Sequence, residues 1–332
     1  MNKQHGKFVI VGAGWAGRTI AGVMVDHNPR MIAGFIEDHP QGERVVVELG
    51  NSHHFIPYLG TSQELLKIVR EQRAAGVVIA VTRDRGDHLL HQIVQCFDAG
   101  VPVIEMPEMY AALAKRIPVR HLNSHWIMPH LRAPQSTLHT FLYNVMNYCV
   151  SCVIFLGLFI PLLPLLAAAI KLDSPGPVFY RQRRVGKRGV HFTLLKFRTM
   201  HKNADKNGAA WTTKDDVRIT RVGRWIRRYR LDELPQLINI FKGELALIGP
   251  RPEAVELVEW FRKEIPFYEY RYLVLPGITG WAQVNYENTC SVEGALEKLQ
   301  YDLYWIMNRS LALDLKIIAK SIVVMITGYG AH

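Results

Sequence analysis

Short apolar runs alternate with amphipathic stretches over the first 110 residues of the chain. The apolar runs have the length of buried strands, and the amphipathic stretches have helical spacing. The predicted strands are residues 7–13, 31–36, 76–81 and 101–105, and the predicted helices are residues 18–27, 62–75 and 87–99. Because parallel strands are joined by crossover helices, this alternation indicates a parallel sheet. We predict an α/β, Rossmann-like domain over residues 1–114.

The first predicted strand runs into a glycine turn, residues 12–17, that fits the spacing G-x-G-x-x-G. Between a strand and a helix this spacing is typical of dinucleotide-binding turns, with a ribose-binding acid about 20 residues further on. Glu37 and Asp38 stand at that position. Gly12, Gly14 and Gly17 are therefore candidate cofactor-binding residues. Alternatively, the glycines serve only the tight turn and the close packing of helix on strand.

The pattern changes after residues 115–137, which are rich in Pro, His and Arg and are predicted to form a linker. Residues 133–170 contain no Asp, Glu, Lys or Arg, and residues 148–170 are mostly Val, Ile, Leu, Phe and Ala. This stretch is long enough for a membrane helix, which needs about 20 apolar residues. We predict a membrane segment over residues 138–171; the alternative is a buried core helix.

Two prolines, Pro161 and Pro164, interrupt the apolar stretch and predict a kink. Residues 181–202 carry eight Lys or Arg and no acid, which indicates the cytoplasmic side of a membrane. The N-terminal domain also has the character of a cytoplasmic nucleotide-type fold. With both flanks on one side, we predict a re-entrant helix that bends near Pro161; a bitopic span is the alternative.

We predict a small mixed α/β domain over residues 172–332, with helices at 253–264 and 311–326. The last helix, and Trp225-Ile226 among arginines, suit a position at a membrane interface. Ordinary amphipathic packing on a core explains the same pattern.

Charge and composition limit the classes of molecule that the chain is expected to bind. The chain has 40 Lys and Arg against 29 Asp and Glu, a net charge of +11, and 49% hydrophobic residues, which excludes a disordered protein. A basic chain with a membrane segment suits anionic headgroups or phosphorylated substrates. We expect no nucleic-acid partner, because the sequence has no zinc-finger, RNA-binding or clear helix-turn-helix motif. The four cysteines form neither a disulfide framework nor a zinc site.

Two adjacent acids, Asp232 and Glu233, follow a stretch of six arginines without an acid at residues 217–231. Arginines hold phosphoryl oxygens, whereas a carboxylate binds a metal ion or attacks phosphorus. A structural alternative is a helix cap, with Asp232 as N-cap, Pro235 in the first turn, and a helix to about Phe241 closed by Gly243. The two interpretations are compatible.

Five motifs over residues 138–326 resemble those of the bacterial sugar transferases, the monotopic polyprenyl-phosphate phosphoglycosyl transferases. They are Lys171-Leu172-Asp173-Ser174-Pro175-Gly176-Pro177, Lys196-Phe197-Arg198-Thr199-Met200, Asp232-Glu233-Leu234-Pro235-Gln236, Gly249-Pro250-Arg251-Pro252 and residues 276–285, PGITGWAQVN. The N-terminal part resembles the Rossmann-like domain of longer members. Those members usually begin with a bundle of transmembrane helices; this sequence has none, which leaves open a shortened or a naturally short form. The family often has Ser before the re-entrant proline, where this sequence has Ile160.

The resemblance implies transfer of a sugar 1-phosphate, a hexose such as glucose or galactose, from a UDP-sugar to undecaprenyl phosphate, with release of UMP. It implies Mg²⁺ dependence, a two-step course, and the start of exopolysaccharide, capsule or O-antigen synthesis. The implied location is the bacterial inner membrane with the catalytic domain, residues 172–332, on the cytoplasmic face. A homodimer is a further expectation.

The resemblance also implies roles for single residues. Asp232 is the expected nucleophile, and Glu233 the base of the second step; both are candidate Mg²⁺ ligands. The expected substrate-binding residues are Arg227 for the polyprenyl phosphate, Arg251, Lys196 and Arg198 for the diphosphate, and Gln283 with Asn285 for sugar or nucleotide. Each of these has a plain structural alternative, such as a solvated arginine or a loop residue.

Two rival functions remain. An NAD-dependent nucleotide-sugar dehydratase or epimerase would combine a glycine turn with a membrane segment, but no Tyr in the chain has Lys four residues later. A membrane-tethered nucleotide-sensing or scaffold protein needs no catalytic residues, and the acid pair argues against it.

Overall fold

The structure, a computed structural model, describes residues 6–50, 52–82, 86–132, 137–202, 216–287 and 291–327. Residues 133–136 of the predicted linker and Cys290 lie outside this range. The chain divides into two compact units, residues 1–129 and 130–332, which we call unit 1 and unit 2. The division into four segments expected from the sequence remains a prediction.

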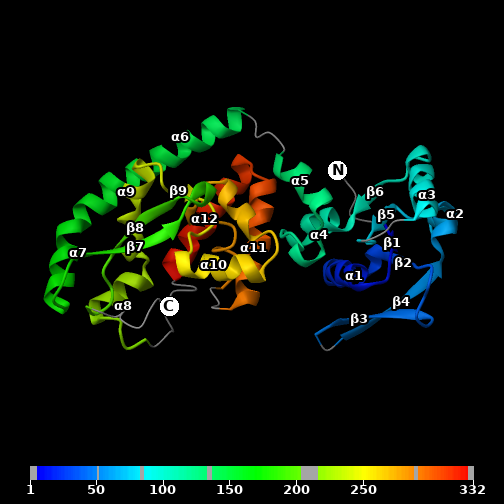
Figure 1. Ribbon diagram of the computed structural model, residues 1–332, viewed down its shortest axis with the longest axis horizontal. Helices are drawn as coiled ribbons and strands as arrows, with labels where there is room; N and C mark the ends of the chain where they lie inside the picture. The colour runs from blue at the N-terminus through cyan, green and yellow to red at the C-terminus, as the bar shows by residue number, and fades with distance from the viewer. Residues whose placement is uncertain are drawn as a thin grey trace. The chain divides into compact units, whose positions relative to one another are not determined.

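Unit 1 is built on a six-stranded sheet in the order β3-β4-β2-β1-β5-β6 (Figure 1). Neighbouring strands are parallel, except that β3 and β4 form an antiparallel pair. The strands are β1 (Phe8–Val11), β2 (Ile32–Ile36), β3 (Arg44–Leu49), β4 (Ser52–Gly60), β5 (Gly76–Ile79) and β6 (Val103–Glu105). Every residue of β1 and β5 is buried, as expected for central strands covered on both faces.

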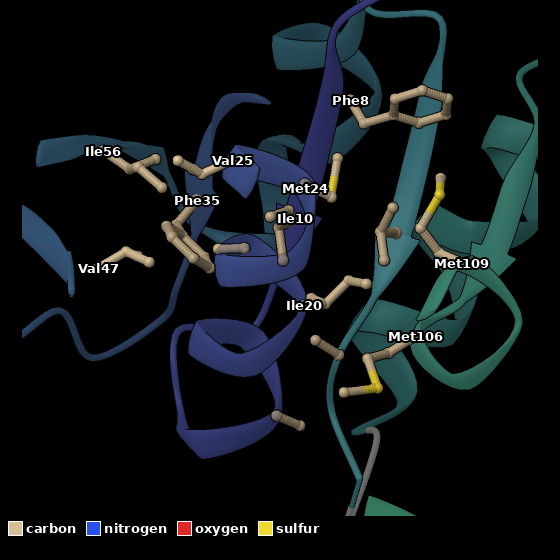
Figure 2. Packing of buried hydrophobic residues seen from close by; sticks show 14 of the residues in the cluster. Phe8, Ile10, Ile20, Met24, Val25, Phe35, Val47, Ile56, Met106 and Met109 are labelled. Atoms are coloured by element: carbon tan, nitrogen blue, oxygen red, sulfur yellow. The ribbon is translucent and has the colours of Figure 1, made fainter. Parts of the chain in front are cut away.

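Helices cover both faces of this sheet. They are α1 (Trp15–His27), α2 (Leu65–Glu71), α3 (Asp87–Asp98) and α4 (Met106–Ala114), with 3₁₀ turns at Pro29–Met31, Ser62–Glu64 and Val119–His121. Helix α5 (Ser124–Arg132) follows in the chain. Figure 2 shows one core layer, in which Ile20 and Met24 of α1 and Met106 of α4 pack against Ile10 of β1. On the opposite face, Leu65 of α2 packs in a second apolar cluster with residues of α3.

The fold class predicted from the sequence is confirmed at the level of a mixed α/β chain with a parallel-dominated sheet and one long apolar helix. The predicted strands and helices of unit 1 all occur. The β3–β4 hairpin and α4 were not expected. In the hairpin, His53 and His54 and the exposed Phe55 interrupt the strand pattern, so periodicity gave no signal there.

Unit 2 begins with one long helix. It consists of α6 (Thr137–Ile154), a π-helical turn (Phe155–Phe159) and α7 (Ile160–Asp173), and Figure 1 shows it curving along the unit. These 37 residues are long and apolar enough to cross a membrane, and 17% of their most apolar window is buried. Pro161 stands in the first turn of α7 and Pro164 inside it. The irregular turn before Pro161 is consistent with the predicted bend, because proline removes a backbone donor.

The remainder of unit 2 is a small mixed domain. Its strands are β7 (Phe179–Val185), β8 (His191–Phe197), β9 (Ala246–Ile248) and β10 (Gly277–Thr279), and its α-helices are α8 (Arg221–Arg228), α9 (Gln236–Phe241), α10 (Val255–Glu264), α11 (Val292–Met307) and α12 (Leu311–Thr327). Shorter 3₁₀ turns are Lys187–Gly189, Leu231–Glu233 and Tyr268–Leu273. Strands β7 and β8 form an antiparallel hairpin, and β9 and β10 a parallel pair.

The α7 end of the long helix is held by residues of two of the sequence motifs. Arg198 is buried and donates to the carbonyls of Pro175, Ile170 and Ser174 at 3.0, 3.3 and 2.6 Å. Gly176, at φ +136°, leaves room for that guanidinium, since a Cβ there would lie 1.8 Å from Arg198 Nη1. Asp173 in turn accepts a hydrogen bond from Val222 N at 2.9 Å and so caps the start of α8.

Candidate functional site

The acid pair lies in a tight turn between two helices. Helix α8 ends at Arg228, Arg230 takes a left-handed conformation at φ +52°, and a 3₁₀ turn carries Asp232 and Glu233. Both acids are buried. The expected cap at Asp232 is wrong: the residue before α9 is Pro235, and Asp232 lies inside the preceding turn. The helix does run to Phe241 and is followed by Gly243 at φ +74°.

A buried asparagine fastens this turn to the neighbouring strand. Asn239 of α9 accepts from Leu195 N at 3.1 Å and donates to Thr193 O at 2.8 Å, both in β8. Because β8 also carries Lys196, the two bonds fix the distance between the lysine and the acids. Lys196 Nζ lies 3.9 Å from Asp232 Oδ2 and 3.7 Å from Glu233 Oε1.

Arg251 completes the cluster from the far side of the acid pair. Its Nη2 donates to Glu233 Oε1 at 2.6 Å and its Nη1 to Oε2 at 3.4 Å, a two-point contact that fixes both planar groups. The structure therefore brings together four of the predicted site residues, Asp232, Glu233, Lys196 and Arg251.

The two carboxylates differ in how they titrate. Burial raises the pKa of Asp232, and the charges of Lys196 and Arg227 only partly offset this. Burial acts on Glu233 in the same direction, but Arg251 and Lys196 outweigh it and hold the Glu233 pKa below its usual range. Burial also lowers the pKa of Lys196. The two cations thus favour the ionised form of Glu233, whereas burial favours the protonated form of Asp232.

The loop carrying Arg251 is held by two further arginines. Arg184 of β7 donates to Pro252 O at 3.0 Å, and Arg271 donates to Arg251 O at 3.0 Å. The neighbouring turn packs so closely on this loop that it requires glycine, because a Cβ on Gly277 would lie 2.1 Å from Gly249 N. These contacts hold the loop, and with it Arg251, in place beside the acid pair.

Behind this loop lies a buried ionic network that sequence reasoning did not find. Arg271 donates to Asp302 Oδ2 at 2.9 Å and to Tyr268 Oη at 2.5 Å, and its Nη1 lies 3.9 Å from Glu253 Oε1. Lys298 Nζ lies 3.8 Å from the same Glu253 oxygen. Burial raises the pKa of Asp302 to about 6. The members are spread over residues 253–302, and only the fold brings them together.

Two other predicted site residues, Arg227 and Gln283, also belong to unit 2. Arg227 of α8 has a pKa lowered by burial, and the charge of Asp232 opposes this effect, so its guanidinium acts on the acid pair. Gln283 has both side-chain polar atoms buried without a hydrogen-bond partner in the part of the chain that the structure describes. Nε2 of Gln236, three residues after Glu233, is also buried without a hydrogen-bond partner among the described residues. Gln236 was not predicted as a site residue. Unpartnered buried amides are costly unless a ligand satisfies them.

Arg198 and Asn285 are engaged elsewhere. The guanidinium of Arg198 is used by the carbonyls at the end of α7, as described above, and its binding role remains a prediction. Asn285 donates to Trp281 O at 2.7 Å and accepts from Lys320 Nζ at 2.6 Å. Gly12, Gly14 and Gly17 belong to unit 1.

The residues present fit a magnesium ion only in part. Among the described residues, no three His, Cys, Asp or Glu side chains come together as a metal cluster. Glu233 is occupied by Arg251 and Lys196, which leaves Asp232 as the available carboxylate. Mg²⁺ is commonly bound by one or two carboxylates together with substrate phosphates, so Asp232 and a diphosphate would form an adequate ligand set.

Chemically, the site is a buried carboxylate beside cations, one of which is already neutralised. Such an arrangement suits an anionic substrate, because Lys196 and Arg227 can screen its charge next to Asp232.

Comparison with known proteins agrees with this chemistry. The model of the family "Bacterial sugar transferase" matches residues 138–328. A UDP-N-acetylgalactosamine-undecaprenyl-phosphate N-acetylgalactosaminephosphotransferase of Aeromonas hydrophila is 41% identical over 240 residues, 72% of this chain and 56% of that protein. A UDP-glucose:undecaprenyl-phosphate glucose-1-phosphate transferase of Escherichia coli K12 is 33% identical over 263 residues, 79% of this chain and 56% of that protein.

A shorter relative also matches: a UDP-glucose:undecaprenyl-phosphate glucose-1-phosphate transferase of Caulobacter vibrioides is 42% identical over 185 residues, 55% of this chain and 69% of that protein. The chain spans little more than half the length of the first two relatives. The family match covers more than half of the chain and contains the whole cluster around Asp232. The chain belongs to the bacterial sugar transferase family.

Proposed function

We propose that the chain transfers a sugar 1-phosphate from a UDP-sugar to undecaprenyl phosphate and releases UMP through a covalent phosphosugar intermediate on Asp232. The observation that carries the proposal is the asymmetry of the acid pair. Glu233 is neutralised by Arg251 at 2.6 Å, whereas Asp232 is buried within 3.9 Å of Lys196 and keeps a raised pKa. The names of the relatives support the reaction.

In the first step, an oxygen of the ionised Asp232 attacks the β-phosphorus of the UDP-sugar. A bond forms between this oxygen and phosphorus, the bond to the bridging oxygen breaks, and UMP leaves with the electron pair. In the second step, an oxygen of undecaprenyl phosphate attacks the same phosphorus and Asp232 departs as a carboxylate. Lys196 screens the negative charge in both steps, and Arg227 holds the lipid phosphate. Arg251 holds Glu233 in place, and the ionised Glu233 assists the second step as a base.

One Mg²⁺ held by Asp232 and the diphosphate, with Glu233 beside it, would neutralise charge on the leaving UMP. Gln283, together with Gln236, would contact the nucleotide or the sugar with its unpartnered amide. Arg198 would act on the diphosphate only if it left the end of α7. The sugar is a hexose, glucose or galactose, or an N-acetylhexosamine as in the Aeromonas relative. The product would start an exopolysaccharide, capsule or O-antigen.

The long helix is proposed to be re-entrant, in the bacterial inner membrane with residues 172–332 at the cytoplasmic face. Both of its ends bond to the same catalytic domain: Tyr143 of α6 donates to Ile248 O at 2.7 Å, and Arg198 donates to Ser174 O at 2.6 Å just beyond α7. A straight span would separate Tyr143 and Ser174 by about 46 Å at 1.5 Å per residue. Unit 1 is proposed to be a Rossmann-like domain, the assembly a homodimer, and nucleic acid no partner.

Membrane topology is tested by labelling single cysteines placed in unit 1 and after residue 172 with a membrane-impermeant maleimide. We expect both positions to be labelled only from the cytoplasmic side. Labelling of the two positions from opposite sides would show a bitopic span instead.

The reaction is tested by UMP release. The purified chain in nanodiscs receives undecaprenyl phosphate, Mg²⁺ and, one at a time, UDP-glucose, UDP-galactose and UDP-N-acetylgalactosamine. UMP formed with one donor establishes the reaction and the sugar. The rival proposal, a nucleotide-sensing scaffold, predicts donor binding without UMP from any of them.

The raised pKa of Asp232 sets the pH dependence of the first step. Only the ionised carboxylate attacks, so the rate falls as the pH drops through this pKa, and the fall begins above the usual Asp value of about 3.9. The measurement is the UMP burst without undecaprenyl phosphate between pH 4 and 8, because a lipid phosphate titrates near about 6 and would obscure the effect. A burst rate that stays constant down to pH 4, with the fold intact by circular dichroism, would contradict the assignment.

A further inference from the structure

Unit 1 contains a cavity of about 570 Å³ at the carboxyl ends of its parallel strands. It is lined by the ends of β1, β2 and β5, the start of α1, and residues 120–123. The chain leaves β1 toward β2 on one side, and returns to β5 on the other, so this is the point where the strand order reverses. In open α/β sheets, ligands bind in the crevice at such a point.

The three glycines of the turn after β1 differ in what the fold requires of them, and two of them, Gly12 and Gly14, line the cavity. Gly12 has φ +97°, and a Cβ there would lie 3.1 Å from Val81 Cγ2. A Cβ on Gly17 would lie 1.9 Å from Gly12 O, so this glycine allows α1 to pack on β1. Gly14 has an ordinary φ of −68°, and a Cβ there would meet nothing within 4 Å. Neither backbone conformation nor packing requires glycine at this position, and the open space beside it belongs to the cavity.

The polar and aromatic groups of the cavity complement one ligand type. Glu37 at the end of β2 accepts from Ala13 N at 2.8 Å through Oε2, which fixes the carboxylate and leaves Oε1 for vicinal hydroxyl groups. The first turn of α1 has no side-chain cap, so its N–H groups are open to an anion. Trp15 is 61% exposed at the mouth, and its ring lies 4.2 Å from that of His121.

A second cavity of about 390 Å³ adjoins the first and extends past β6. Both are lined by Val81, Thr82, His121 and Asn123. The two cavities together provide room for a ligand made of two linked groups.

We propose that this crevice of unit 1 binds a ribonucleoside diphosphate joined to a second group, that is, a dinucleotide or a nucleotide sugar. Glu37 holds the ribose hydroxyls, the open first turn of α1 and Arg120 face the phosphates, Trp15 offers a face for a base, and the adjoining cavity takes the second group. The site concerns unit 1 alone and does not depend on the transferase chemistry of unit 2.

The test is isothermal titration of the full chain in nanodiscs with NAD⁺ and, separately, with UDP-glucose, on the unaltered protein and on Gly14→Val. A valine fits the backbone at residue 14 but fills the cavity mouth, so we expect affinity to fall at least about tenfold. Gly86→Val is the matched control, because a Cβ there also meets nothing within 4 Å and residue 86 does not line the cavity.

The two probes distinguish the ligand sources. Heat from NAD⁺ that is lost in Gly14→Val and kept in Gly86→Val shows a dinucleotide site. Binding heat from UDP-glucose that is lost in Gly14→Val and kept in Gly86→Val shows that the sugar donor itself binds unit 1, separately from any binding at Asp232. Absence of binding by both probes at 1 mM, or equal binding by the unaltered protein and Gly14→Val, overturns the proposal.

A second variant tests the placement of the ribose. Glu37→Gln keeps an acceptor for Ala13 N but removes the charge. We expect NAD⁺ to bind about fivefold more weakly and the preference over NADP⁺ to shrink, because Glu37 repels a 2′-phosphate. A purely structural role of Glu37 would leave the NAD⁺ to NADP⁺ ratio unchanged.

Discussion

Asp232→Asn is expected to abolish UMP release, by at least about 10³-fold, without loss of the fold. The amide keeps the shape of the side chain but cannot form a bond to phosphorus. Because burial raises the pKa of Asp232 above its value in the unfolded chain, the ionised form opposes folding, and this cost grows as the pH rises through the raised pKa. The variant should therefore melt at or above the temperature of the unaltered protein at neutral pH.

Two controls accompany this measurement. Asp98→Asn, an exposed carboxylate in unit 1, should change neither UMP release nor the melting temperature. Glu233→Gln should lower the melting temperature, because it leaves Arg251 and Lys196 without their buried counter-ion. UMP release by Asp232→Asn at more than a tenth of the unaltered rate would remove Asp232 from the role of nucleophile.

Arg271→Met is expected to produce the largest loss of stability, about 3–5 kcal/mol, because it strands the buried carboxylates that the arginine serves. Asp302 at 2.9 Å and Glu253 at 3.9 Å would lose their shared cation, and Arg251 O its donor. The measurement is the melting temperature in nanodiscs, together with KM for the UDP-sugar, which should rise as the Arg251 loop loosens.

Arg262→Met is the matched control, since the ion pair of Arg262 is with the exposed Glu269 at 3.2 Å and its guanidinium also lies 5.6 Å from the ring of Tyr272, so no buried carboxylate among the described residues loses its cation. Its melting temperature should stay within about one degree, as surface ion pairs contribute little. If Arg271→Met and Arg262→Met had the same melting temperature, the ionic network behind the Arg251 loop would have no part in holding that loop. Asp302→Leu combined with Arg271→Met should recover part of the loss, because both partners are then removed.

Four residues that the sequence singled out lie together in the structure, and they could be predicted because they stand in short motifs. Asp232 and Glu233 are adjacent, and Lys196 and Arg251 each occur in a motif on which the resemblance rests. The supporting residues could not be found in this way. Arg271 lies in the turn Tyr268–Leu273, whereas Lys298 and Asp302 lie on α11. A charged residue on an amphipathic helix is ordinarily solvated, so nothing local distinguishes them.

The same distinction holds for the fold. Strands β1 and β5 were predictable because burial on both faces makes them continuous apolar runs. The β3–β4 hairpin lies at the sheet edge, where exposed residues such as Phe55 and the histidines obscure the period of two. The cap expected at Asp232 failed because Arg230 adopts a left-handed conformation that the sequence does not announce.

The contacts of α6 have a consequence for how the enzyme can be divided. Asn147 accepts from Leu247 N at 2.6 Å, and Tyr143 donates to Ile248 O at 2.7 Å, so the apolar helix takes the place of a sheet neighbour for β9. Strand β9 leads directly into the loop of Arg251. Cutting away the helix to obtain a water-soluble catalytic fragment would therefore expose an unpaired strand edge and release the loop at the same time. The apolar helix and the proposed site are joined through β9, so a chain truncated before β7 should lose the proposed UMP release.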